Sequence, residues 1–249
     1  MPAFAKFFST LKGSREIVRS RPNHDLTIQA YKFNEDDLNV LKVRFQLAAE
    51  DHVISNIPNE KIEEFPEKYF CPKVNRKMLI DEDFDIRKIS NFSDSPIRTF
   101  FRKMQIVTRN PLGMPESRTD DLVADLLRVV KMNDDPLMIA QHLPRKLYIL
   151  NEPYVSAEPE FVVTKGVISM VFVEDKTLEN TNRLCAYGEM QIAAELLACE
   201  NDNVREDSKI TDQVLFGEND KKSGLDLAHP DGRRKVLTAL AKIRQYLLK

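Results

Sequence analysis

The stretch PEFVVTKGVISMVFVEDK, residues 159–176, contains two apolar runs joined by a glycine, with charged residues at both ends. β-Branched and aromatic residues dominate these runs, which predicts two strands. Gly166 supplies the backbone freedom that a tight turn needs, so we expect an antiparallel β-hairpin. Burying a carboxylate or an ammonium is costly, and Glu160, Glu174 and Lys176 are therefore expected at the open end of the hairpin, where the core stops.

The register of this hairpin decides whether its charges meet. A turn centred on Val167, or a bulge with the same effect, sets Glu160 opposite Glu174 on one side of the sheet. A two-residue turn at residues 165–166 instead sends the two carboxylates to opposite faces. Strand alternation predicts that one face of the second strand carries Ile168, Met170, Phe172, Glu174 and Lys176.

Two carboxylates at the same point of a sheet favour a bound cation, because each raises the pKa of the other unless positive charge lies between them. Carboxylate oxygens suit Mg²⁺ or Mn²⁺, which keep several waters and bind one or two protein carboxylates besides a substrate phosphate. Lys176 would orient or help to deprotonate a metal-bound water, or stabilise negative charge on a phosphate. Taken alone, EDK also fits an ordinary Glu–Lys surface pair at a strand end.

Helices are expected on both sides of the hairpin. Residues 114–135 place Pro115 at a first helical position with acids in the first turn, which predicts a helix. Residues 145–155 predict one further strand, so the order is α, β, β, β, α. The helix expected within 179–202 has four inward positions: Cys185, Ile192, Leu196 and Cys199. Polar residues beside the apolar faces of the two helices are Glu116 and Asp120 on the first and Gln191 and Glu195 on the second.

The spacing of PE, thirteen residues and then EDK resembles the motif of the PD-(D/E)XK nuclease superfamily. GEMQIAAELLA, residues 188–198, is similar to the second core helix of that family, and residues 223–248 are similar to the tails of fungal nuclease-like proteins. The resemblance covers residues 114–204 and implies an α/β fold with a restriction-endonuclease-like αβββαβ core around a central mixed sheet. It further implies a Mg²⁺- or Mn²⁺-dependent endonuclease, a hydrolase of phosphodiester bonds that acts on DNA in preference to RNA.

Site residues follow from the same resemblance by position. The implied catalytic residues are Glu160, Glu174, Lys176 and Gln191. The implied metal ligands are Glu116, Glu160, Glu174 and Asp175, with Asp120 as the alternative to Glu116 and Glu195 as a further helix residue. Glu160 departs from the family pattern, because it replaces the usual Asp and adds one methylene. The fourth strand of the family has only QVLFG, residues 213–217, to match it.

Residues 1–110 lie outside the resemblance. Their pattern predicts a mainly helical N-terminal region, followed by the nuclease-like domain at residues 111–249. Asn34 is expected to cap a core-facing helix whose inward residues are Leu38, Leu41, Phe45 and Ala48. Residues 95–110 predict another helix, which ends at NPLG.

The formal charge of the chain is −2, from 37 basic and 39 acidic residues, so nucleic-acid contact requires local basic clusters. Residues 1–23 and 232–249 are basic and fit either phosphate contact or a solvated helix face. The basic residues of the second cluster are Arg233, Arg234, Lys235, Lys242, Arg244 and Lys249.

The three cysteines show no CxxC spacing, which argues against a disulfide framework or a zinc site and favours a reducing compartment. An intracellular location is expected, with the nucleus and the cytoplasm both left open. No apolar run approaches the roughly 18 residues of a membrane span, so no membrane association is predicted. The oligomeric state is open, and a homodimer is one of the alternatives.

Two other functions compete with the nuclease. The chain could keep a nuclease fold without turnover and bind nucleic acid or protein, as an effector or a toxin does. Alternatively, the N-terminal region could be the functional part, as a protein-interaction domain.

Overall fold

The structure is a computed structural model that describes residues 27–43, 61–63, 65–89, 95–110, 115–173, 187–205 and 226–248. Within these ranges the chain is a mixed α/β protein. Its α-helices are α3 (Glu35–Leu41), α5 (Arg76–Ile80), α6 (Ser95–Arg109), α7 (Ser117–Val129), α8 (Tyr187–Arg205) and α9 (Pro230–Leu247). Its 3-10 helices are η2 (Ala30–Lys32), η4 (Glu67–Tyr69) and η5 (Ile86–Lys88). Its strands are β1 (Ile28–Gln29), β2 (Leu137–Gln141), β3 (Arg145–Ile149), β4 (Glu152–Ala157), β5 (Phe161–Lys165) and β6 (Ile168–Val173).

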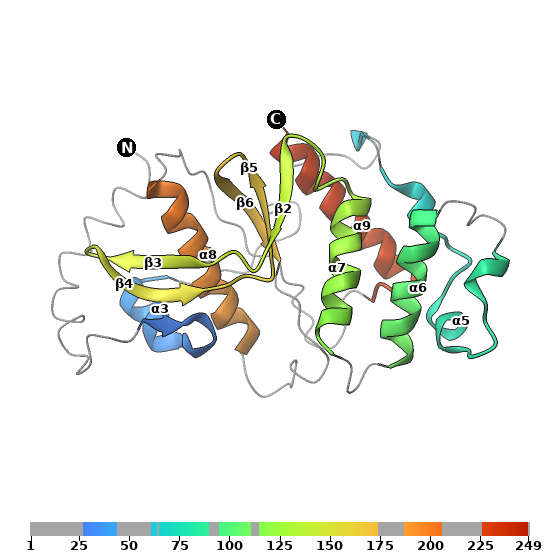
Figure 1. Ribbon diagram of the computed structural model, residues 1–249, viewed down its shortest axis with the longest axis horizontal. Coiled ribbons are helices and arrows are strands. Elements are labelled where there is room, and N and C mark those ends of the chain that lie inside the picture. Colours follow the sequence, from blue (N-terminus) through green and yellow to red (C-terminus); the bar gives the residue numbers. More distant parts are fainter. Residues whose placement is uncertain are drawn as a thin grey trace.

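These elements form an elongated arrangement, shown in Figure 1. Helices α5, α6, α7 and α9 lie at one end, and α3, α8, β3 and β4 lie at the other. Strands β2, β5 and β6 stand between the two ends. None of the described helices is long and apolar enough to cross a membrane.

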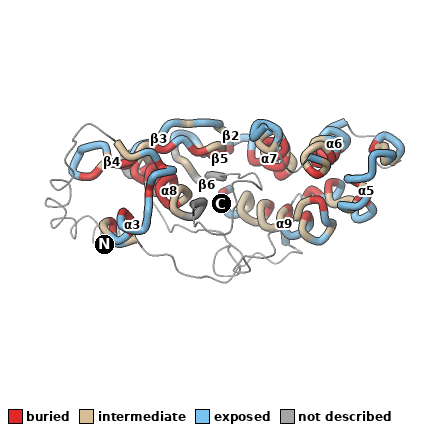
Figure 2. The backbone as a smooth tube through the Cα atoms, turned by 90° about the horizontal axis from the view of Figure 1, so that it is seen from below, coloured by how far each residue is buried: buried red, intermediate tan, exposed pale blue. Residues whose placement is uncertain are grey.

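The helical end has a core of aromatic and aliphatic side chains. Figure 2 shows α9 on one side of α6 and α7, with buried residues where the helices face one another. Phe100 and Phe101 of α6 are fully buried, and their rings meet edge to face with centroids 5.4 Å apart. Leu127 of α7 and Leu237 of α9 belong to the same buried cluster. The helices predicted at residues 95–110 and 114–135 are confirmed as α6 and α7.

The β1-β4-β3 sheet is covered by α8. Strand β4 pairs in parallel with β1 and antiparallel with β3. The single strand predicted over residues 145–155 is wrong, because the chain turns back between β3 and β4 at Leu150 and Asn151. Both turn residues have positive φ, 54° and 69°, which matches the two-residue turn that the twist of a hairpin favours. Leucine seldom adopts this conformation, so the sequence carries no clear signal for the turn.

The β2-β5-β6 sheet is antiparallel throughout and lies between α8 and α7 in Figure 1. Strand β2 was not expected from the sequence. The prediction of one central mixed sheet is also wrong for the described strands, which form two three-stranded sheets. The β3–β4 hairpin separates the two sheets along the chain, because it pairs with itself and with β1 rather than with β2 or β5.

Local signals at helix ends agree with the structure. Asn34 caps α3 with a complete capping box, in which its side chain accepts from the backbone and Asp37 accepts from the amide of Asn34. Leu38 and Leu41 are buried as predicted, whereas residues 45 and 48 lie outside the described ranges.

The buried face of α8 differs from the predicted one. Ala193, Ala194, Ala198 and Cys199 are buried, but Ile192 and Leu196 are only partly buried, and residue 185 lies outside the described ranges. Small alanine side chains let α8 approach the sheet closely, and the largest apolar residues of this helix do not mark its contact face.

Two buried clusters organise the described residues. One joins α5, α6, α7 and α9 with β2 and β5. The other joins η2 and α3 with β3, β4 and α8. Each cluster therefore combines residues from both sides of residue 110, the division predicted from the sequence.

Candidate metal and nucleic-acid site

The β5–β6 hairpin has a two-residue turn and a β-bulge, and beyond the bulge its strands pair in the predicted register. Its turn consists of Gly166 and Val167, with Gly166 at φ 64°, so Lys165 pairs with Ile168 and Thr164 with Ser169. A β-bulge follows, and beyond it Val163 pairs with Val171 and Phe161 with Val173. The turn centred on Val167 is therefore wrong, and the predicted alternative, a bulge with the same effect on the register, is confirmed for the described pairs up to Phe161 with Val173. The predicted faces of Ile168, Met170 and Phe172 concern side chains that the structure does not describe.

Glu160 stands where the buried part of β5 begins. The next four residues, Phe161 to Thr164, are at most 5% exposed, so both faces of β5 are covered. Glu160 itself is partly exposed, and its carbonyl accepts the His142 amide at 3.3 Å, which continues the pairing of β2 with β5. The carboxylate thus lies at the end of the sheet, as the cost of burying charge predicts.

The acidic candidates on α7 differ in exposure. Glu116 is exposed and lies one residue before the helix. Asp120 is in the first turn and partly buried, and its Oδ1 atom is buried with no hydrogen-bond partner among the described residues. Buried carboxylate oxygens are normally satisfied, so Asp120 is the α7 candidate whose buried oxygen could accept a further ligand, as far as the described residues show.

The two polar candidates on α8 contact each other. Gln191 Nε2 donates to Glu195 Oε1 at 2.8 Å, one helical turn away. Glu195 is 1% exposed, which its sequence position did not indicate. Glu200 on the same helix is also buried, and burial raises the pKa of its carboxyl group to about 7. Burial likewise raises the pKa of the Cys199 thiol to about 12, so this cysteine stays protonated at neutral pH.

Three of the predicted site residues, Glu174, Asp175 and Lys176, lie outside the described residues. Within the described ranges no group of three or more His, Cys, Asp or Glu side chains is placed to hold a metal ion. The described half of the predicted site consists of Glu160, Glu116 and Gln191, together with the two further candidates on α7 and α8.

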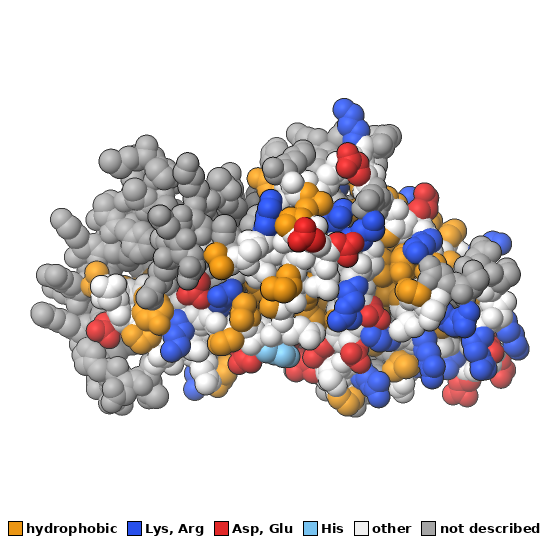
Figure 3. All heavy atoms as spheres, turned by 45° about the horizontal axis from the view of Figure 1, so that its top comes forward, with side chains coloured by type: hydrophobic (Ala, Val, Ile, Leu, Met, Phe, Trp, Pro, Cys, Tyr) orange, Lys and Arg blue, Asp and Glu red, His pale blue; other side chains and the backbone are white. Residues whose placement is uncertain are grey.

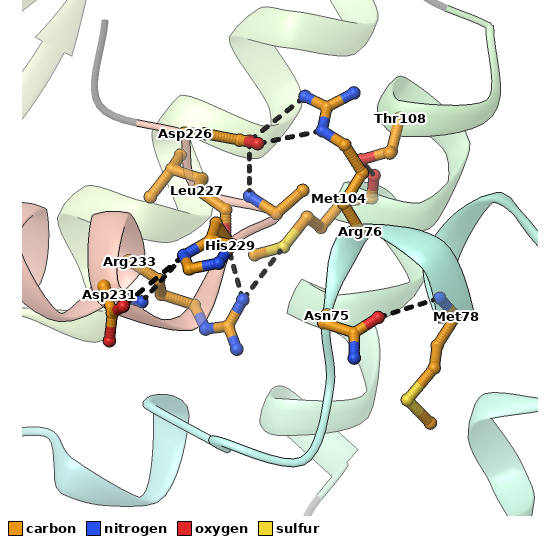
Figure 4. Close-up of polar contacts among 11 residues, drawn as sticks. Asn75, Arg76, Met78, Met104, Thr108, Asp226, Leu227, His229, Asp231 and Arg233 are labelled. Carbon is orange, nitrogen blue, oxygen red and sulfur yellow. Dashed lines mark hydrogen bonds and ion pairs between the residues drawn. The ribbon is translucent and has the colours of Figure 1, made fainter. Parts of the chain in front are cut away.

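Arg233 is not a nucleic-acid contact, which corrects the prediction for the basic C-terminal cluster. It is fully buried, and its guanidinium donates to four backbone carbonyls at 2.8–2.9 Å, those of Phe70, Cys71, Val74 and Leu227. Figure 4 shows the guanidinium beside Met104 and Leu227, and it also lies 5.0 Å from the ring centroid of Phe101. Burial lowers the pKa of Arg233 to about 10, so the group remains charged at neutral pH.

Hydrogen bonds fix the segment before α9, residues 226–229, next to Arg233. Asp226 accepts two hydrogen bonds from Arg76, at 2.8 and 3.1 Å, and one from the Ala228 amide. A Cβ atom on Gly232 would come within 2.3 Å of the Asp226 carbonyl oxygen, so only glycine fits there. Residues 226–233 therefore join the C-terminal helix to the segment at 70–76.

Among the other basic residues of α9, some make structural contacts and others are exposed. Arg244 donates from Nε to the Lys131 carbonyl at 3.1 Å and is partly buried. Arg234 is exposed, stacks on the Phe70 ring at 3.8 Å and lies 3.5 Å from Glu67. Lys235 is exposed, and residues 1–23 and Lys249 lie outside the described ranges. Figure 3 shows lysine and arginine side chains interspersed with acidic ones over the helical end.

A polar cluster that the sequence did not indicate connects α8 with both sheets. Arg145 of β3 donates to Asp202 of α8 at 3.2 Å and to the Ser169 hydroxyl of β6 at 2.8 Å. Asn203 of α8 binds both backbone groups of Ser169, and Asn201 accepts from the Tyr148 amide of β3. The only sequence signal was the polar end of a helix, END at residues 200–202, which is common on exposed helices.

Comparison with known proteins found no matching family model, no matching curated protein and no matching solved structure.

Proposed function

We propose that the chain is a divalent-metal-dependent nuclease that hydrolyses phosphodiester bonds in DNA. One observation carries the proposal, the register of the β5–β6 hairpin beyond its bulge. Phe161 pairs with Val173, and one further step in the same register would set Glu160 opposite position 174, which lies outside the described residues. A PD-(D/E)XK site needs such a juxtaposition of carboxylates, and the described register is compatible with it, whereas a register shifted by one residue would not be.

The order of elements supports the same proposal. Helix α7, the antiparallel strands β2, β5 and β6, and helix α8 follow one another in the order α, β, β, β, α when the β3–β4 hairpin is taken as an insertion. In this scheme Glu160 precedes the middle strand and residues 174–176 follow the third. The inserted hairpin accounts for the second sheet, which the family pattern does not contain.

Each site residue has a role in this proposal. Glu160 and Glu174 would hold Mg²⁺ or Mn²⁺ with Asp175, and the metal would supply Lewis-acid stabilisation of the phosphate. Asp120 fits the further ligand position better than Glu116, because its Oδ1 atom is buried without a hydrogen-bond partner among the described residues. Lys176 would orient the attacking water, and Gln191 would help to place it. Phosphate contacts would come from exposed basic residues such as Arg234 and Lys235.

The test is cleavage of plasmid DNA and of RNA with Mg²⁺, Mn²⁺ or EDTA, by the parent protein, Lys176→Ala and Lys146→Ala. Lys146 is an exposed lysine of β3 and serves as the matched control. We expect cleavage of DNA with metal, none with EDTA, loss in Lys176→Ala and no change in Lys146→Ala. Cleavage that persists in EDTA or in Lys176→Ala would refute the assignment. Binding of nucleic acid without any cleavage would instead favour a nuclease fold that has lost turnover.

A second substitution tests the position of Glu160. Glu160→Asp restores the usual acid of the family and shortens the side chain by one methylene. If Glu160 holds the metal from a stretched position, we expect kcat to rise by about tenfold, because misplacement by roughly one bond length is costly in an active site. Unchanged activity in an active enzyme would contradict a stretched position of Glu160.

A further inference from the structure

One side chain of α9 holds the short segment of residues 61–63 against the C-terminal part of that helix. Gln245 Nε2 donates to the Lys61 carbonyl at 3.0 Å, and Gln245 Oε1 accepts the Glu63 amide at 3.2 Å. The two hydrogen bonds lie on either side of Ile62, and both are exposed. A single amide group therefore binds the main chain on both sides of Ile62, including the carbonyl of the Lys61–Ile62 peptide bond.

The structure around this contact is held independently of Gln245. Arg244, the preceding residue of α9, donates to the Lys131 carbonyl at 3.1 Å, which fixes this part of the helix to the end of α7. Phe65, two residues after the segment, packs against the buried cluster of the helical end. Residues 61–63 do not belong to that cluster. We therefore expect that segment 61–63 can leave α9 while the helix and the core stay in place.

The Lys61–Ile62 peptide bond has the chemistry that a trypsin-like protease recognises. Lys61 is exposed, and proteases of this class bind a basic side chain in a pocket that contains a carboxylate. They bind the carbonyl of the cleaved bond in an oxyanion hole and hold an extended substrate through its main chain. Gln245 occupies the Lys61 carbonyl and the nearby Glu63 amide, and residues 61–63 belong to no strand. Cleavage therefore requires that Gln245 first releases the segment.

We propose that Lys61–Ile62 is a processing site for a protease that cuts after lysine, and that Gln245 restricts its cleavage. In this reaction water adds across the amide bond, which leaves a carboxylate on Lys61 and a free amine on Ile62. The proposal is independent of the nuclease function, because none of these residues belongs to the metal site. Its partner is a protease with a negatively charged pocket for the lysine side chain.

Cleavage at this bond is not expected to separate the two resulting chains under native conditions. Strand β1 pairs with β4, and residues of η2 and α3 share a buried cluster with β3, β4 and α8. These contacts join residues before the bond to residues after it without any need for the main chain between them. We therefore expect the cleaved protein to remain one particle that comes apart only in denaturant.

The test is limited digestion of the full chain by trypsin, with the fragment that begins at Ile62 quantified by mass spectrometry at early times. We expect Gln245→Ala to raise the initial rate of this cleavage about fivefold, because two hydrogen bonds that oppose opening are lost. Gln245→Glu keeps the acceptor for the Glu63 amide and should give an intermediate rise. Gln141→Ala is the control, since Gln141 is an exposed glutamine of β2, and it should leave the rate unchanged. Cleavage after Lys77, an exposed residue of α5, should be equal in all variants.

Equal rates in the parent and in both Gln245 variants would overturn the role of Gln245. Absence of the Ile62 fragment from every digest would overturn the processing site itself. An equal rise in cleavage after Lys77 would show general destabilisation and would also overturn the proposal. If Gln245→Ala does not fold, Gln245→Glu decides alone. Size-exclusion chromatography of the cleaved protein is the second measurement, and elution as two separate chains would contradict the expected noncovalent association.

Discussion

Arg233 of α9 and Glu200 of α8 are both buried ionisable side chains, but they differ in their hydrogen bonding and therefore in their charge near neutral pH. Arg233 donates to four backbone carbonyls and keeps its charge, with a pKa lowered only to about 10. Glu200 has a buried Oε2 atom without a hydrogen-bond partner among the described residues, and burial raises the pKa of its carboxyl group to about 7.

The difference separates a structural charge from one that titrates. A buried charged group whose N–H groups all have hydrogen-bond acceptors keeps its charge at neutral pH. A buried carboxylate with an unsatisfied oxygen has a raised pKa and becomes protonated near neutral pH. The helical end around Arg233 is therefore expected to respond to substitution but not to pH. The α8 region is expected to respond to both.

Replacement of Arg233 should cause the largest loss of stability among these substitutions. Arg233→Met replaces the guanidinium with an apolar side chain of similar length and leaves four carbonyls without their donor. We therefore expect a loss of about 4 kcal/mol in the free energy of unfolding. Urea titration followed by circular dichroism measures it. Arg234→Ala, at the neighbouring exposed position, should cost less than about 1 kcal/mol. Equal losses in the two variants would show that the carbonyl network contributes little.

Gly232→Ala tests the segment that carries the Arg233 network. The added Cβ would lie 2.3 Å from the Asp226 carbonyl oxygen, and this backbone group cannot move without disturbing the Arg76–Asp226 pair. We expect a loss of about 3 kcal/mol in unfolding free energy. Gly166→Asn is the control, because a Cβ at that position meets no atom within 4 Å and asparagine tolerates positive φ. A stability of Gly232→Ala equal to that of the parent would contradict the close approach.

Glu200→Gln should produce a smaller effect that depends on pH. Because the folded pKa, about 7, lies above the ordinary value of 4.5, the folded state binds a proton that the unfolded state has lost between these values. The wild-type chain should therefore lose stability as pH rises from about 4.5 to about 7. Glu200→Gln should gain about 2 kcal/mol over the parent at pH 8 and close to nothing at pH 4.5. Urea midpoints of both proteins at these two pH values test this, and a gain independent of pH would mean that Glu200 does not titrate in this range.

Helix ends were predictable from the sequence because their signals are local. Asn34 and the acids that follow it specify the start of α3, whereas α7 begins at Ser117, two residues after the Pro115 predicted at its first position. The strand pattern and Gly166 identified the β5–β6 hairpin, and the cost of burying charge identified Glu160 as a residue at its end.

The errors share a cause, which is that the deciding contacts come from distant parts of the chain. Arg233 reads as a surface residue within a basic run, but segment 70–74 folds over it and supplies carbonyls. The turn at Leu150 depends on the pairing of β3 with β4, not on turn-forming residue types. Glu195 lies within the apolar run IAAELLAC and Glu200 within the polar run END, and only packing against other elements makes both side chains buried.

The sequence by itself determined the positions of the main helices, the existence of the β5–β6 hairpin and the place of Glu160 at its end. These depend on caps, on apolar periodicity and on the cost of burying charge, all of which act within one segment. Only the tertiary structure decided the bulged register of β6, the division of the strands into two sheets and the burial of Arg233. Burial of a charge is decided by partners outside the segment, and for Arg233 these are the carbonyls of Phe70, Cys71 and Val74, far away in the sequence.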